Sequence, residues 1–239
     1  MRLRLSLTFL ATLLWAGQAL AYPVQVYFSW GSGPTQNTTL GSTQLGETPN
    51  TDGTYDYDGS TSTAGWALSW DVTAKPDPFV DAVFAVTNNT AGTQTYAIVF
   101  TLPVTPAIAP SSLTGASVIG NLTVNGDGGT LGHAGGTTAM FTALIDGAPY
   151  DTLLPFDSSV TLAFGSGSTG SDDFGLPGLT QPGPAVTTSI GIQLTFTLTP
   201  GDSASFTSRF EVVEVPEPMA GLLLGSGLAG LVAFGRNRR

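Results

Sequence analysis

Residues 190–198 read IGIQLTFTL, and an apolar side chain occupies every second position. Gln193, Thr195 and Thr197 alternate with those apolar side chains. Successive side chains of a β-strand point to opposite faces, so the pattern predicts a strand with one buried and one solvent-facing side. Such strands are typical of antiparallel sheets packed over a single core.

The same period of two recurs elsewhere in the chain. Further predicted strands cover Val24–Trp30, Trp66–Val72, Val80–Val86, Tyr96–Leu102, Val160–Phe164 and Phe206–Val212. Turn residues separate them: Asn88–Gly92 and Thr199–Asp202 are each predicted to join two strands as a hairpin, the second through a type II turn. The fold class is therefore expected to be all-β, an antiparallel β-sandwich of jelly-roll or immunoglobulin-like type.

Two stretches lack this alternation. Residues 31–64 are rich in Gly, Thr, Asn and Asp, and residues 165–184 are rich in Ser, Gly, Asp and Pro. We expect both to be long loops, and loops of this length tend to be mobile or functional.

The composition limits the possible functions. The chain has 239 residues, no cysteine and a formal net charge of −10. Between the two terminal segments the only basic side chains are Lys75 and Arg209, so this body repels phosphate backbones and is not expected to bind nucleic acid. With the termini set aside, about 195 residues remain, which is enough for one domain at residues 22–214.

The carboxyl end carries an ordered series of features from residue 215 to residue 239. Val215 precedes Pro216-Glu217-Pro218, an uncharged apolar run follows at 219–235, and Arg236, Arg238 and Arg239 lie at the terminus. The prolines favour an extended segment. The run is just long enough for a transmembrane helix, and the arginines favour a cytoplasmic end. A plain C-terminal membrane anchor is the alternative.

The amino end has the organisation of a secretory signal peptide at residues 1–21. Arg2 and Arg4 precede an apolar stretch at 5–15, and Ala19 and Ala21 form the small-x-small site for signal peptidase. The mature chain is then expected to begin at Tyr22. An uncleaved N-terminal anchor is the alternative, which the shortness of the stretch disfavours.

The C-terminal series, Pro216-Glu217-Pro218 with a short Gly/Leu/Ala-rich span and terminal arginines, resembles the PEP-CTERM sorting signal of Gram-negative bacteria. The resemblance covers about the last 25 residues. It implies recognition by exosortase, transit through the inner membrane, and delivery to the outer surface or the extracellular matrix. With no catalytic groups assembled in the body, we expect a non-catalytic structural or adhesive role in biofilm or exopolysaccharide.

Residues 52–59 contain the best metal candidate. Asp52, Asp56 and Asp58 alternate with other residues before a glycine, as in part of an oxygen-ligand calcium loop. The EF-hand pattern itself fails, because Gly65 stands where the last acidic ligand belongs. Calcium is therefore a weak expectation beside an ordinary acidic hairpin tip, and no other cofactor is expected.

Two further functions stay open. Tyr55 and Tyr57 lie outside the clear strands, and as exposed aromatic rings they would suit a carbohydrate-binding module, whereas Trp66 and Trp70 belong to the core. Asp172-Asp173 would suit a carboxylate-based glycosidase or lyase only if a loop turned both side chains inward. His133, the only histidine, is interpreted as an ordinary loop residue.

Overall fold

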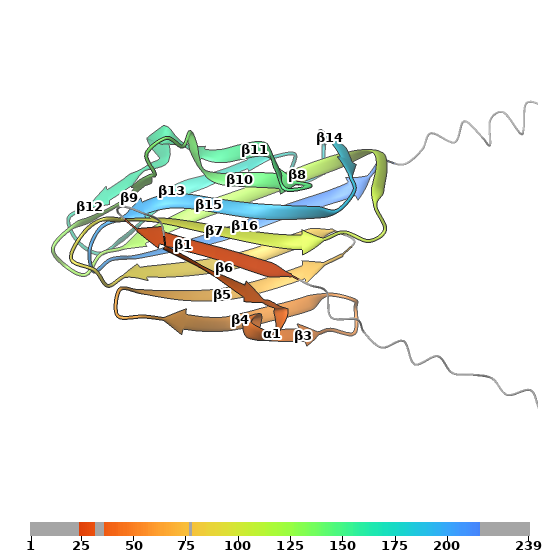
Figure 1. Cartoon of the computed structure of the whole chain (residues 1–239). Helices are drawn as coiled ribbons and strands as arrows, with labels where there is room; N and C mark the ends of the chain where they lie inside the picture. Colours follow the sequence, from red (N-terminus) through yellow and green to blue (C-terminus); the bar gives the residue numbers. More distant parts are fainter. Residues whose placement is uncertain (1–23, 32–35, 77, 216–239) are drawn as a thin grey trace, which may run out of the picture.

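The computed structural model describes residues 24–31, 36–76 and 78–215. These residues form two antiparallel β-sheets, as the alternation predicts (Figure 1). The first sheet has the order β11 (Ala148–Pro155), β10 (Ala139–Ile145), β15 (Ser189–Leu198), β7 (Gln94–Pro103), β1 (Gln25–Gly31) and β2 (Gln36–Gly41). It is extended by β9 (Gly129–His133), which pairs with β15 and with β12 (Val160–Leu162).

The second sheet is built around the longest described strand. Its order is β13 (Ser166–Phe174), β8 (Ile108–Thr123), β16 (Ser203–Glu214), β6 (Phe79–Asn88), β5 (Trp66–Lys75), β4 (Tyr55–Ser62) and β3 (Glu47–Pro49). A further strand, β14 (Gln181–Val186), pairs with the first half of β8. Two short helical turns, α1 (Ser42–Leu45) and η1 (Phe156–Ser158), complete the described elements.

The core lies between the two sheets. Phe196 of the first sheet contacts Phe206 of the second with ring centroids 4.8 Å apart. Trp66 and Trp70 are buried in the core, as expected, with 4% and 5% of their surface exposed. The Trp70 indole N–H donates to the Leu45 carbonyl at 3.0 Å, so helix α1 is fastened to the second sheet. Burial of these large apolar side chains is the main source of stability.

Each stretch predicted as a strand contains one, and the alternation correctly assigns the buried face in all of them except at Phe164. The stretch at 190–198 is all of β15 except its first residue, and β15 lies between β7 and β10 with neighbours on both edges. Val160–Phe164 is shorter than predicted, because β12 ends at Leu162 and Phe164 is 79% exposed.

The two predicted turns exist, but neither closes a hairpin. Asn88–Gly92 leads from β6 of the second sheet to β7 of the first, and Thr199–Asp202 leads from β15 of the first to β16 of the second. Both turns therefore cross between the sheets. They lie side by side, because the Gly201 N–H donates to the Asn88 carbonyl at 2.7 Å and the Asn88 N–H to the Asp202 carbonyl at 2.9 Å.

The prediction of two long loops was wrong. The stretch at 31–64 contains β2, α1, β3 and the whole of β4, and the stretch at 165–184 contains β13 and most of β14. Strands β2 and β3 each form an edge of a sheet, and β13 and β14 pair only with β8, so none of these strands needs a continuous apolar face. Backbone hydrogen bonds hold such strands in place whatever their side chains.

Both ends of the described body lie at the same end of the sandwich. Strands β7 and β16 each start at one of the crossing turns, so they finish at the opposite end. Gln25 pairs with Thr101 near the end of β7, and the Val215 N–H after β16 donates to the Ser111 carbonyl at 3.5 Å. The chain therefore enters and leaves the sandwich far from the crossing turns.

The expected terminal segments fall mostly outside the described residues. This holds for the signal peptide at 1–21, for Pro216–Pro218, for the span at 219–235 and for the basic tail at 236–239. Among the helices that are described, none is both long and apolar enough to cross a membrane.

Candidate binding face on the second sheet

The outward side of the second sheet, here called the second-sheet face, carries rows of side chains that the strand register places side by side. The row through the middle of the sheet consists of Asp56, Thr73, Asp81, Arg209, Ser117 and Asp173, from β4 to β13. The next row consists of Asp58, Asp71, Val83, Thr207, Ile119 and Ser171. Most of these side chains are short and polar, so the face offers hydroxyl and carboxylate groups close to the sheet backbone.

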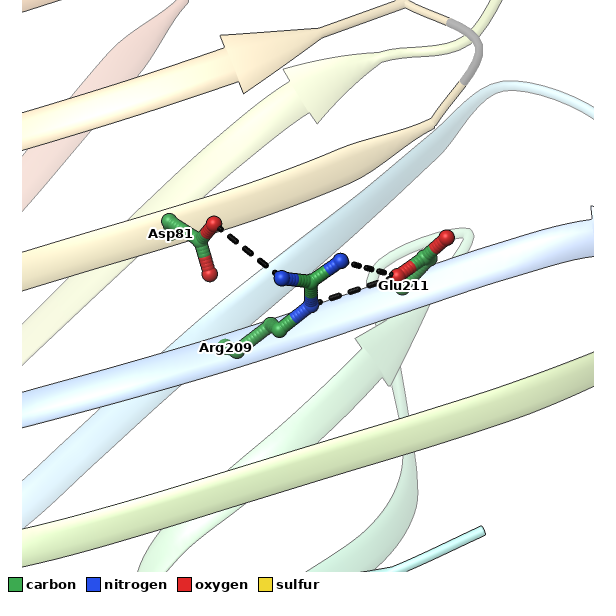
Figure 2. A network of polar contacts seen from close by, with 3 residues as sticks. All are labelled: Asp81, Arg209 and Glu211. Atoms are coloured by element: carbon green, nitrogen blue, oxygen red, sulfur yellow. Dashed lines mark hydrogen bonds and ion pairs between the residues drawn. The ribbon is translucent and has the colours of Figure 1, made fainter. Parts of the chain in front are cut away.

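Arg209 on β16 joins two acids, Asp81 and Glu211, into a network on this face (Figure 2). Its guanidinium lies between Glu211 on the same strand and Asp81 on β6, and Arg209 and Asp81 are cross-strand partners. The Nη2 and Nε atoms donate to Glu211 Oε2 at 2.5 and 3.2 Å, and Nη1 donates to Asp81 Oδ2 at 3.5 Å. Both nitrogens on one side of the guanidinium thus bind Glu211, while the contact with Asp81 is long.

Two members of the network have shifted pKa values. The pKa of Arg209 is raised, first by the hydrogen bond to Glu211, so the guanidinium stays charged. The pKa of Asp81 is raised because burial disfavours its carboxylate, an effect that the Arg209 charge partly offsets. The Arg209 guanidinium also lies over the Phe79 ring, 5.8 Å from its centroid, which adds a cation–π contact.

A hollow of about 420 Å³ opens on the face beside Arg209. Its walls come from five strands, with Asp71 and Thr73 on β5, Asp81, Ala82 and Val83 on β6, Thr207, Ser208 and Arg209 on β16, Ser117, Val118 and Ile119 on β8, and Ser171 on β13. Charged groups line one part of it, while Val83, which is 39% exposed, and Ile119 provide apolar contact area.

Two further hollows lie on the same sheet. One of about 410 Å³ shares Ser117 and Ser171 with the first and continues to Asp173 and Pro177. Another of about 210 Å³ lies over β4, β5 and β6, where Ser60, Ser69 and Thr87 contribute hydroxyl groups. The face therefore suits a ligand that extends across several strands.

The three aspartates of the weak calcium candidate, Asp52, Asp56 and Asp58, make separate local contacts. Asp52 lies in the β3–β4 turn and accepts from the Thr54 hydroxyl at 2.7 Å, which lowers its pKa. Asp56 accepts from Asn50 at 2.9 Å and from Thr73 at 2.7 Å, whereas Asp58 lies opposite Asp71 on β5. Within the described ranges, no three His, Asp or Glu side chains are grouped so that they could hold a metal ion.

The expected exposed aromatic pair is not on the surface. Tyr57 on β4 is fully buried, its ring centroid is 6.3 Å from that of Phe100, and burial raises the pKa of its hydroxyl. Tyr55 is partly buried against the same core. Both belong to a strand that the sequence hid, and their positions in β4 point them inward. A sugar-stacking platform of Tyr55 and Tyr57 is therefore excluded.

Asp172 and Asp173 lie on strand β13 and not in a solvated loop. Asp172 accepts from the Leu154 N–H at 2.8 Å, while Asp173 is exposed on the second-sheet face opposite Ser117. As adjacent strand residues they point apart, so they do not form a catalytic pair. His133 also differs from expectation, because it ends β9 and its Nε2 atom binds the Pro155 carbonyl at 2.8 Å.

Comparison with known proteins adds no assignment. No protein-family model matches this chain, and no curated protein or solved structure matches it either. The chemistry of the second-sheet face therefore rests on its own residues.

The sequence reasoning did not single out Asp81 or Glu211 as functional residues, and it noted Arg209 only for its charge. One signal was present: Arg209 and Glu211 are two positions apart in an alternating stretch, so they share the polar face of one strand. Asp81 could not be added, because nothing in the pattern shows that β6 lies beside β16.

Proposed function

We propose that this chain is an exported protein that an exosortase-type system delivers to the cell surface or extracellular matrix. There it has a structural or adhesive role in biofilm or exopolysaccharide. The observation that carries the proposal is the order of features at the carboxyl end, Pro216-Glu217-Pro218, the apolar run and the terminal arginines, together with the signal peptide at residues 1–21.

The geometry of the body supports this arrangement. Residues 24 and 215 leave the sandwich at one end, so a tail held at the membrane would present the opposite end and both outer faces to the exterior. The acidic composition keeps such a body away from anionic surfaces.

Deletion of Pro216–Pro218 tests the sorting step. We expect the deletion variant to stay with the inner membrane, while wild type reaches the surface fraction. Arg209→Gln, a change in the folded body, is the control and should be sorted normally. Unchanged processing and location of the deletion variant would contradict the proposal.

For the body we infer a jelly roll and not an immunoglobulin-like sandwich. The support is a nested series of strand pairs, β6 with β16, β7 with β15, and β8 with β14, in which successive strands alternate between the two sheets. A long antiparallel ribbon wound around a core has this order. A crystal structure in which these pairs are not nested would refute the inference.

A second candidate function is carbohydrate binding at the second-sheet face. Sugar hydroxyl groups both donate and accept hydrogen bonds, and the hollow offers Arg209 as donor, Asp71 and Asp81 as acceptors, and the Ser117 and Thr207 hydroxyls as either. The neighbouring hollows would let a chain continue across the sheet. Because this face carries several acidic side chains besides the basic Arg209, a neutral glycan suits it better than an anionic one.

Titration of neutral and acidic oligosaccharides against the purified body tests this candidate. Asp81→Asn and Arg209→Gln should each weaken binding of the neutral glycan, whereas Gln193→Ala, on the outward side of the first sheet, should leave it unchanged. Equal binding by all three variants would exclude the second-sheet face as the carbohydrate-binding site. Release of reducing ends would instead support the glycosidase or lyase alternative, with Asp71 and Asp81 as the first carboxylates to test.

A further inference from the structure

Asn125 and Gly126 form the turn that leads from β8 toward β9, and this is the only Asn-Gly sequence in the chain. Both residues are exposed. An asparagine followed by glycine is chemically labile, because the next backbone nitrogen can reach the side-chain amide carbon when no Cβ shields it. We propose that Asn125 is a site of spontaneous deamidation in the folded protein.

The local geometry favours this reaction. Gly126 has φ of +117°, and a Cβ built on it would meet nothing within 4 Å, so the approach to its nitrogen is open. Among the described residues no acceptor engages the Gly126 N–H. The Asp127 N–H donates to Asn125 Oδ1 at 3.4 Å, which holds the carboxamide over the following peptide and polarises its carbonyl.

The chemistry needs only water. The Gly126 nitrogen attacks Cγ of Asn125, a new C–N bond forms, and the side-chain nitrogen leaves as ammonia. Water then opens the five-membered imide at one of its two carbonyls. The products are aspartate, or isoaspartate in which the main chain runs through the former side chain.

Asn125 is in direct contact with the crossing turn at Thr199–Asp202. The Asn125 N–H donates to Asp202 Oδ1 at 3.1 Å, and Asp202 is fully buried and also accepts from the Thr199 hydroxyl. A Cβ added to Gly201 would fall 2.0 Å from the carboxamide nitrogen, so this group rests directly on the crossing turn. Isoaspartate lengthens the backbone at this contact and places a second carboxylate near Asp202. Deamidation therefore loosens the crossing turn.

Peptide mapping by mass spectrometry during incubation of the full-length folded protein in mildly alkaline buffer tests the proposal. The peptide containing Asn125 should gain the mass of amide-to-acid conversion before those containing Asn50, Asn89 or Asn121, and isoaspartate should be found there. Asn125→Gln should abolish the change, because its longer side chain would have to close a larger ring. The aged wild type should melt at a lower temperature, whereas the aged variant should keep its starting Tm. An unchanged Asn125 peptide, or faster conversion at another asparagine, would overturn the proposal.

Discussion

Replacement of Asn88 by alanine should destabilise the sandwich strongly, because this side chain ties the two sheets together. Asn88 ends β6 of the second sheet and is fully buried. Its Nδ2 atom donates to the Leu198 carbonyl on β15 of the first sheet at 2.9 Å and to the Gly92 carbonyl at 2.9 Å. Its Oδ1 atom accepts from the Thr90 N–H at 3.0 Å and from the Thr90 hydroxyl at 2.7 Å.

The magnitude follows from which partners water can reach after the change. Leu198 is fully buried, so its carbonyl loses a donor that water does not replace, a loss of about 1–3 kcal/mol. Gly92 is exposed and Thr90 half-buried, so the hydrogen bonds to them are partly replaced by water and contribute roughly 0.5–1 kcal/mol together. We therefore expect Asn88→Ala to lower the free energy of unfolding by about 1.5–4 kcal/mol.

Urea unfolding followed by tryptophan fluorescence measures this effect, since Trp66 and Trp70 are buried. In thermal unfolding of the same variant, the Tm should fall by on the order of 10 °C in a body of this size. Asn89→Ala is the matched control, because Asn89 is exposed and its change should stay within about 0.5 kcal/mol. Equal stability of the two variants would refute the role of Asn88 as a tie between the sheets.

Three further outcomes test other parts of the structure. Asp146→Asn should lower the free energy of unfolding by about 1 kcal/mol near neutral pH. Burial raises the pKa of the Asp146 carboxyl, but hydrogen bonds from Thr187, Thr188 and Ser189 have the larger effect and hold this pKa well below its usual range. Because the pKa of Asp146 is lower in the folded state than in the unfolded state, its carboxylate stabilises the fold above about pH 4. The stability difference between variant and wild type, measured by urea unfolding at several pH values, should therefore shrink in more acidic solution. Gly59→Ala should lower the free energy of unfolding by roughly 1–3 kcal/mol, since its Cβ would lie 2.7 Å from Trp70 Cζ2, while exposed Ser60→Ala should change it little. Arg209→Gln should change stability by less than about 1 kcal/mol in the same assay, because the side chains of Arg209 and Asp81 are 42% and 45% exposed.

Alternation predicted β1, β5, β6, β7, β12, β15 and β16, but not β10, where Met140, Phe141, Leu144 and Ile145 are buried without strict alternation. It did not predict β8, the longest described strand, because its inward positions include Ser112, Thr114, Ala116 and Gly120. The small residue at Gly120 has a packing reason: a Cβ there would lie 3.0 Å from the Phe206 ring. A strand that faces bulky partners can therefore have a small, polar sequence, and a period count does not recognise it.

The candidate site depends on contacts that no local pattern contains. Arg209 and Asp81 are 128 positions apart, and they meet only because β6 and β16 pair in a particular register. In the same way, Asn88–Gly92 and Thr199–Asp202 were recognisable as turns, but whether consecutive strands pair or cross to the other sheet depends on the whole core. The alternating pattern thus predicted part of the strands, while the second-sheet face required the fold, and the predicted tail lies outside the described residues.

The most direct test of the central proposal is the intact mass of the protein recovered from the cytoplasmic and surface fractions of its own cells. We expect a surface-located chain that begins at Tyr22 and has been processed close to Pro216–Pro218. A full-length chain that still begins at Met1 and is found only in the cytoplasm would contradict export and the surface role together.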